Sequence, residues 1–246
     1  MRQQTRTSKP HVQGFSLIEL LVVMLLMSTI MGAIVNQIAL LQQRSRTEQA
    51  KLDIFQESRD FVDQFVRDVH QTGYPSLRMF DTSSWTTAPL SPIYTEPKLA
   101  AGIIFISPSE IKFEGDVDGG GIVNVVDYSL LATGNNCSCL QRGAVNKGSG
   151  SAVFSNQVQN VQSAGTTADP IFVGYTALGT AVTSADMTTL AGRQALATIK
   201  TVQIRLKTKA AVVDPKTRLA PETTLSGQVT IVNCSLVATQ QANSCS

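Results

Sequence analysis

The sequence predicts an α+β protein, with one long N-terminal helix packed on a mainly antiparallel β-sheet. Two observations carry this prediction. Residues 15–72 contain no proline and keep a helical spacing of apolar side chains. After residue 75 the chain changes to short β-branched stretches separated by Gly, Pro, Asn and Ser. We expect four segments, namely an N-terminal peptide (1–14), a membrane-spanning helical half (15–41), an amphipathic half of the same helix (42–73) and a β-rich head (74–246).

The apolar segment 15–41 is long enough to cross a bilayer, for which about 20 residues suffice. It is too long for the core of an ordinary secretory signal, and no small-residue cleavage site follows it. The basic peptide before it favours a cytoplasmic N-terminus, although Arg44 and Arg46 beyond it weaken that preference. Without this peptide the chain has 17 basic and 18 acidic residues, so we expect no nucleic-acid partner.

One carboxylate interrupts the apolar segment near its start. Glu19 lies among Phe15, Ile18 and Leu20. A charge at the centre of a membrane helix costs roughly 2.5–3.5 kcal/mol. Near the helix end the cost is lower, and a negative side chain in the first turn suits the helix dipole. A plain membrane anchor that tolerates this glutamate is one interpretation.

Residues 14–19, GFSLIE, support another interpretation, because they resemble the prepilin-peptidase motif of type IV pilins and type II secretion pseudopilins. The resemblance implies cleavage between Gly14 and Phe15, N-methylation of Phe15 and an assembly role for Glu19. Cleavage would create a positive amine about one helical turn from Glu19. In a fibre, the resemblance implies that Glu19 pairs with the amine of a neighbouring subunit.

The following segment, 43–72, is charged but keeps one apolar stripe. We expect the stripe to pack on the head, while the first half of the helix enters lipid or contacts other subunits. Gly73 and Pro75 should end the helix. The stripe comprises Leu52, Phe55, Phe61, Val62, Phe65, Val66 and Val69.

Residues 52–75, LDIFQESRDFVDQFVRDVHQTGYP, are similar to the PilW-type minor pilins, which are related to J-type pseudopilins. The similarity implies a minor pilin that primes or joins type IV pilus assembly with other pilins after cleavage by prepilin peptidase. It implies a single-pass inner-membrane protein with a periplasmic head, which later enters the pilus fibre or tip. The alternatives are a J-type pseudopilin, a generic amphipathic stalk, and a calcium-binding or adhesive module on a pilin anchor.

In the head, residues 183–198 predict a loop followed by a short helix, and six other stretches predict strands. The clearest alternation places Val202, Ile204 and Leu206 on one face of a strand. The expected strand regions are 101–116, 121–131, 152–164, 170–178, 199–210 and 225–236.

Four cysteines follow the apolar segment, where an outward-facing head would favour disulfides. Three pairings are open, and we favour Cys234 with Cys245, which closes a short loop. Cys137 and Cys139 would share a face of a strand, where a direct bridge is strained. We expect them to stay reduced, or one of them to pair with a C-terminal cysteine. The lack of a CxxC motif disfavours zinc.

The stretch GDVDGGGIVNVVD (115–127) approximates a calcium-loop pattern. Asp116, Asp118, Asn124 and Asp127 fall at its first, third, ninth and twelfth positions. Two departures oppose a calcium loop, since the fifth position is glycine and the twelfth is Asp rather than the usual Glu. The flanking residues read as strands, so a β-hairpin with a Gly-rich turn is the competing interpretation.

No set of catalytic residues stands out, so we expect neither enzymatic activity nor a required cofactor. The two histidines are His11, in the N-terminal peptide, and His70, on the helix. They leave no histidine in the head for a nucleophile–base pair. The sequence also lacks a nucleotide-binding fingerprint.

Overall fold

The computed structural model describes residues 16–76, 79, 96–131 and 137–233. The chain divides into two compact units, residues 1–46 and 47–246. One helix, α1 (Leu17–His70), contributes residues to both units. Its ends lie within two residues of those that the sequence predicts. The long helix forms because no proline interrupts this stretch and its good helix formers tolerate the one internal Gly32.

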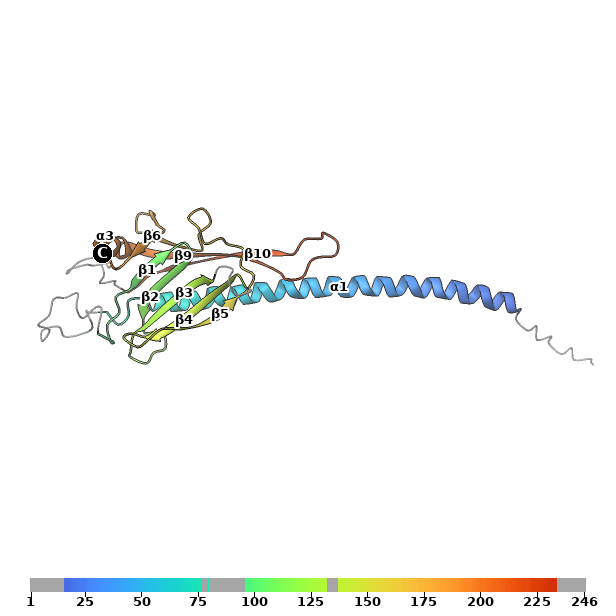
Figure 1. The fold of residues 1–246 in the computed structure, drawn as a ribbon, viewed down its shortest axis with the longest axis horizontal. Coiled ribbons are helices and arrows are strands. Elements are labelled where there is room, and N and C mark those ends of the chain that lie inside the picture. The colour runs from blue at the N-terminus through green and yellow to red at the C-terminus, as the bar shows by residue number, and fades with distance from the viewer. Residues whose placement is uncertain (1–15, 77–78, 80–95, 132–136, 234–246) are drawn as a thin grey trace, which may run out of the picture. The chain divides into compact units, whose positions relative to one another are not determined.

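The described residues of the second unit form the end of α1 (47–70), two antiparallel sheets and one short helix (Figure 1). The elements after α1 are β1 (Ile103–Ser107), β2 (Glu110–Gly115), β3 (Asn124–Leu131), β4 (Cys139–Asn146), β5 (Val153–Val158), β6 (Phe172–Thr176), β7 (Ala181–Val182), β8 (Ala185–Asp186), α3 (Leu190–Ala197), β9 (Ile199–Lys209) and β10 (Glu222–Thr230). The predicted α+β class is confirmed.

The strands form two sheets, whereas the sequence suggested one. The first sheet has the order β5-β4-β3-β2-β1-β8, and the second has the order β10-β9-β6-β7. The chain leaves the first sheet after β5, and Val161 makes a β-bridge with Thr208 of β9. β6 then pairs with β9 rather than with β5, which starts the second sheet.

The α1 helix joins the two sheets through one aromatic side chain. Phe65 is fully buried. Its ring lies 5.2 Å from that of Tyr128 in β3 and 5.6 Å from that of Phe172 in β6. Burial of a phenylalanine side chain contributes about 1.5–3 kcal/mol. Phe65 therefore connects the helix to both layers of the core.

The apolar stripe of α1 is narrower than the sequence predicted. Phe61, Val62 and Val69 are buried, but Leu52 and Phe55 are 59% and 42% exposed. At about 100° per residue, Leu52 lies roughly 140° around the helix from Phe65, which explains its exposure. The inclusion of Leu52 and Phe55 in the packed stripe was wrong. Ile54 and Ser58, which the prediction omitted, complete the buried face instead.

All six predicted strand regions contain strands, and the alternation in β9 is confirmed by buried Val202, Ile204 and Leu206. The short helix α3 also lies within the predicted region and is capped by Thr189, whose Oγ1 accepts a hydrogen bond from Gly192 N (3.0 Å). β10 is shifted, since it covers 222–230 rather than 225–236.

The sequence did not predict β4. Its residues include Gly143 and few β-branched side chains, so its propensity for a strand is low. In the fold, Gly143 is paired with Phe154 of β5. A Cβ atom at Gly143 would come within 3.1 Å of the Phe154 ring. The aromatic side chain thus covers the glycine and supplies packing that the local sequence lacks.

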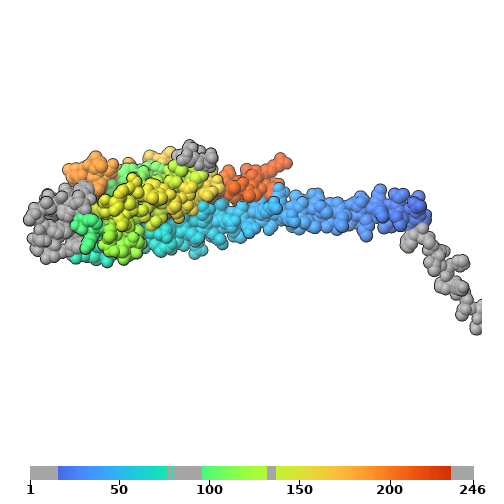
Figure 2. Space-filling model, turned by 60° about the horizontal axis from the view of Figure 1, so that its bottom comes forward, coloured from blue at the N-terminus to red at the C-terminus, as the bar shows by residue number. Residues whose placement is uncertain are grey.

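The end of α1 is fixed against β2. Gly73, at a φ of 79°, leaves the helix and donates its N–H to Glu114 O at 2.8 Å. Thr72 forms a β-bridge with Gly115, and a Cβ atom at Gly115 would collide with the Gln71 carbonyl. In Figure 2 the yellow atoms of the segment that includes β5 lie beside the cyan atoms of α1, and just after β5 Gln159 N donates to Glu57 Oε1 of the helix at 3.1 Å.

Candidate functional site

In the part of the chain that the structure describes, the apolar part of α1 presents exposed side chains. From Leu17 to Leu41 the large hydrophobic residues are exposed. An 18-residue window of this helix has a mean hydropathy of 2.4, and none of the window is buried. By length and composition, α1 is the one helix among the described residues that could cross a membrane. A helix that is apolar on all sides requires lipid or other protein around it.

The start of α1 positions Glu19 in the first helical turn. The backbone N–H groups of Glu19 and Leu20 donate to Ser16 O at 3.0 and 3.2 Å. The Glu19 side chain is exposed. Gly14 and Phe15, the predicted cleavage and methylation residues, lie outside the described residues. Cleavage and methylation therefore stay predictions.

Two hydroxyl groups within the apolar segment are satisfied by their own helix. Ser28 Oγ donates to Leu25 O at 2.9 Å, and Thr29 Oγ1 donates to Leu26 O at 2.8 Å. Such bonds allow polar side chains to enter an environment without water. The ionisable side chains of residues 16–46 are Glu19, Arg44 and Arg46. This composition suits association and offers no nucleophile–base pair.

Residues 9–35 match the family model of the prokaryotic N-terminal methylation motif. The match supports a pilin-like protein. It includes Gly14, Phe15 and Glu19 and ends within the apolar part of α1. A comparison with curated proteins finds no match. The long helix α1, which begins within the motif, and the antiparallel sheets of the head are consistent with this pilin-like architecture.

The pilin-like helix carries a buried acidic residue that the sequence did not reveal as structural. Asp68 is 3% exposed. Its Oδ2 accepts hydrogen bonds from Arg142 Nε and Tyr128 OH, each at 2.7 Å. Its Oδ1 accepts one from Gln64 Nε2 at 2.6 Å. Both carboxylate oxygens of Asp68 therefore have hydrogen-bond donors. The bonds from Tyr128 and Arg142 join α1 to β3 and β4.

This arrangement shifts two pKa values. Burial and the adjacent Asp68 carboxylate raise the pKa of Tyr128 well above its usual range. Desolvation alone would lower the pKa of Arg142, but the hydrogen bond and charge of Asp68 raise it above its ordinary value. Arg142 therefore stays charged and Tyr128 stays a neutral donor. The cluster is a structural ion pair rather than an acid–base site.

A second buried ion pair lies near the end of α1. Lys147 Nζ is 2.6 Å from Glu114 Oε2 and also donates to Leu99 O at 2.8 Å. Ala101 N donates to the same Glu114 oxygen at 2.8 Å. Burial raises the pKa of Glu114, although the Lys147 charge opposes this shift. The pair fixes residues 97–101 to β2 and to the end of β4.

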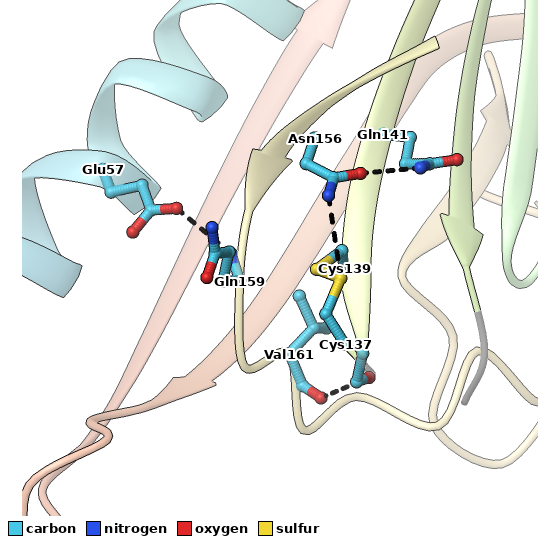
Figure 3. The surroundings of a disulfide bond; sticks show 8 residues. Glu57, Cys137, Cys139, Gln141, Asn156, Gln159 and Val161 are labelled. Carbon is cyan, nitrogen blue, oxygen red and sulfur yellow. Dashed lines mark hydrogen bonds between the residues drawn. A yellow bond between two sulfur atoms is a disulfide. The ribbon is translucent and has the colours of Figure 1, made fainter. Parts of the chain in front are cut away.

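The structure joins Cys137 and Cys139 in a disulfide bond (Figure 3). The expected strain of a direct bridge assumed that both residues are in a strand, where their Cα atoms would be about 6.8 Å apart. Cys137 instead precedes β4, and the two Cα atoms are 5.3 Å apart, within the usual range for a disulfide. The expectation that this pair stays unbridged was therefore wrong. Cys234 and Cys245 lie outside the described residues, so their pairing stays a prediction.

Around the disulfide, polar contacts fix the segment that follows β5 to the residues before β4 and to α1 (Figure 3). Asn156 Nδ2 donates to Cys137 Sγ at 3.8 Å, and Ser138 Oγ donates to Val161 O at 2.8 Å. Gln159 N donates to Glu57 Oε1 on the helix at 3.1 Å. These contacts indicate a stabilising role for the bridge.

The Gly-rich stretch forms the turn of the β2–β3 hairpin. Pairing of Gly115 with Asn124 places Asp116 and Asp118 in the turn. Asp127 belongs to β3 and lies opposite Lys112, with its Oδ2 3.2 Å from Lys112 Nζ. Asp127 is three positions after Asn124 in the strand, an odd number, so the two side chains face opposite sides of it. A twelve-residue calcium loop ending at Asp127 is therefore wrong.

Proposed function

We propose that this protein is a minor pilin of the PilW type, which joins or primes a type IV pilus after prepilin peptidase cleaves it between Gly14 and Phe15. The methylation motif over residues 9–35 is the observation that carries the proposal. The sequence of residues 52–75 favours the PilW type within the broader group of pilin-like proteins.

The proposed role is association without catalysis. The exposed apolar side chains of residues 17–41 first lie in the inner membrane and then pack against the helices of other pilins. The second half of α1 forms part of the head core through Phe61, Phe65 and Val69. One helix thus supplies both the intersubunit surface and a structural element of the head.

Glu19 gives this association a preferred register. Cleavage before Phe15 creates a positive amine, which Glu19 of a neighbouring subunit neutralises in the fibre. Loss of one partner from an ion pair in apolar surroundings leaves an uncompensated charge, which costs about 3–5 kcal/mol in protein interiors. A subunit in the wrong axial position therefore pays this cost, and a subunit in the correct position does not.

The N-terminus of the mature protein tests the proposal. We would purify the protein from cells with and without prepilin peptidase and determine its N-terminal mass. The expected product begins at a methylated Phe15 when the peptidase is present and at Met1 when it is absent. A Met1 start in cells that contain active peptidase would overturn the proposal.

The alternative is a J-type pseudopilin, because the same helix sequence is similar to both groups. The two alternatives are distinguished by testing whether the mature protein is present in fibres sheared from the cell surface. Presence of the mature protein in purified type IV pili, and loss of pili on deletion of its gene, would support the minor pilin. Loss of protein secretion with normal pili would support the pseudopilin.

A further inference from the structure

The β2–β3 turn contains a buried carboxylate oxygen without a hydrogen-bond donor. Asp116 is 8% exposed. Its Oδ2 accepts a hydrogen bond from Gly121 N at 3.0 Å. Its Oδ1 is shielded from solvent and has no hydrogen-bond partner among the described residues. A buried charged oxygen without a partner is costly, so this atom lacks either a donor or a cation.

A second carboxylate lies next to this oxygen. Asp118 Oδ1 accepts a hydrogen bond from Gly120 N at 2.9 Å, and its Oδ2 accepts a longer one from Asn124 Nδ2 at 3.4 Å. The Asp118 side chain also interacts with that of Asp116. Two adjacent carboxylates repel one another unless a positive charge lies between them. Among the described residues, the nearby cations are engaged elsewhere, with Lys112 on Asp127 and Lys147 on Glu114.

The remaining polar groups of the turn are oxygens and amides. Asn124 is buried, its Oδ1 accepts from Val117 N at 3.2 Å, and its Nδ2 donates to Asn146 Oδ1 at 2.9 Å. Gly119 and Gly121 adopt φ values of 70° and 75°, which bring the backbone around the two acids. The turn therefore offers hard oxygen ligands and contains no sulfur or imidazole.

We infer that the β2–β3 turn binds a single calcium ion, with Asp116 Oδ1 and the Asp118 carboxylate as its charged ligands. Calcium takes six to eight oxygen ligands in flexible geometry, which backbone carbonyls of the turn and water complete. No three His, Cys, Asp or Glu side chains cluster for metal binding anywhere in the described parts of the chain. With two carboxylates, the affinity should fall in the weak range of extracellular modules, about 10⁻⁴–10⁻³ M.

This site is smaller than the loop that the sequence suggested, because Asp127 is not a ligand. The ion would instead stabilise the junction between the hairpin and the end of α1. Asp116 N donates to Tyr74 O at 2.9 Å, and Thr72 bridges Gly115 beside it. Calcium should therefore raise the unfolding temperature of the head and leave the apolar segment unchanged.

Thermal unfolding of the mature, full-length protein in detergent tests this inference. We would compare calcium chloride at about 10 mM, above the expected dissociation constant, with magnesium chloride and with sodium chloride of equal ionic strength. The wild type should unfold roughly 3–8 °C higher in calcium. Equilibrium dialysis with radioactive calcium should show one site that is saturated over the same range.

Three isosteric variants identify the ligands. Asp116→Asn and Asp118→Asn should each remove most of the calcium-induced rise, whereas Asp127→Asn should keep it, since that side chain faces away. Each variant is compared with itself without calcium, so a change in its basal stability does not affect the result. No rise in the wild type, an equal rise with magnesium, or a rise that persists in both Asp116→Asn and Asp118→Asn would overturn the inference.

Discussion

Arg142 of β4 and Asp68 of α1 form an ion pair, with Arg142 Nε 2.7 Å from Asp68 Oδ2. Asp68→Ala would leave Arg142, Tyr128 and Gln64 without their acceptor. We expect a loss of about 3 kcal/mol in the free energy of unfolding, because breaking a buried pair leaves an uncompensated charge. Denaturant unfolding followed by circular dichroism measures this loss.

Asp63→Ala is the matched control for this prediction. Asp63 is on the same helix but 56% exposed, and its Oδ2 lies 3.9 Å from Arg59 Nε. Surface pairs of this kind contribute little, so the control should change stability by less than about 0.5 kcal/mol. Equal effects of the two substitutions would show that the Asp68 contacts do not stabilise the head.

Gly227 of β10 packs directly on the helix. A Cβ atom at this position would lie 2.6 Å from Val62 Cγ1 and 3.2 Å from Ile204 Cγ2. Gly227→Ala should therefore destabilise the head by about 1–3 kcal/mol through overpacking. The adjacent Ser226 is exposed, so Ser226→Ala serves as the control and should have a much smaller effect. A Gly227→Ala variant with an unchanged free energy of unfolding would contradict this close packing.

Glu114 should give the head a specific pH dependence. Burial raises its folded pKa above the ordinary 4.5, despite the opposing charge of Lys147. Between pH 4.5, the ordinary pKa that applies to the unfolded chain, and the higher pKa of the folded state, the folded state binds more protons than the unfolded state. The free energy of unfolding therefore falls as the pH rises through this range. The contribution of Glu114 is fully present below about pH 4.5 and is lost as pH passes the folded pKa.

Glu114→Gln removes this titration and isolates its effect. The stability of the wild type relative to the variant should decrease as pH rises from about 4 to about 7. Urea unfolding of both proteins across this range gives the difference directly. A difference that grows with pH would show that the ionised Glu114–Lys147 pair outweighs the burial of the carboxylate.

Trypsin digestion without reduction tests the cysteine pairing. Cleavage after Lys112, Arg142 and Arg218 places Cys137 with Cys139 in one peptide and Cys234 with Cys245 in another. We expect both peptides to be separate and each to be lighter by two hydrogen atoms than its reduced form. A covalent link between the two peptides would contradict both pairings. As a control, reduction should raise the mass of each peptide by two hydrogen atoms.

Glu19→Ala should permit cleavage but reduce fibre incorporation by roughly a hundredfold or more, because a neighbouring amine then stays unpaired, at a cost of about 3–5 kcal/mol. Quantification of the mature protein in sheared fibres and in membranes measures the effect. Ser28→Ala is the control, since its hydroxyl bonds Leu25 O within the same helix. Normal incorporation of Glu19→Ala would argue against the ion pair.

The long helix and most of the strands could be predicted from the sequence because their signals are local. An uninterrupted helical pattern followed by Gly73 and Pro75 predicts where α1 ends, and the alternation around Ile204 predicts β9. The motif around Glu19 is equally local, since cleavage depends on adjacent residues. Such features need no knowledge of distant parts of the chain.

The features that the sequence did not reveal depend on distant partners. In the sequence, Asp68 cannot be distinguished from a solvent-exposed acidic residue on an amphipathic helix. Its contact with Arg142, 74 positions later, forms only in the folded chain. β4 depends on its pairing with β3 and β5, where Phe154 lies against Gly143, and the Cys137–Cys139 bridge depends on where that strand begins. In the Gly-rich turn, the sequence could indicate an acidic cluster but not which face of β3 Asp127 occupies.

The packing of β10 on α1 determines when the head can be completed. Gly227, which covers Val62, comes 165 positions after it in the chain. Contacts between such distant residues raise the contact order, and proteins with high contact order fold slowly. Until residues 222–230 have been synthesised, one face of the helix stays without its final cover. A chain that stops before β10 therefore cannot complete the packing of the head.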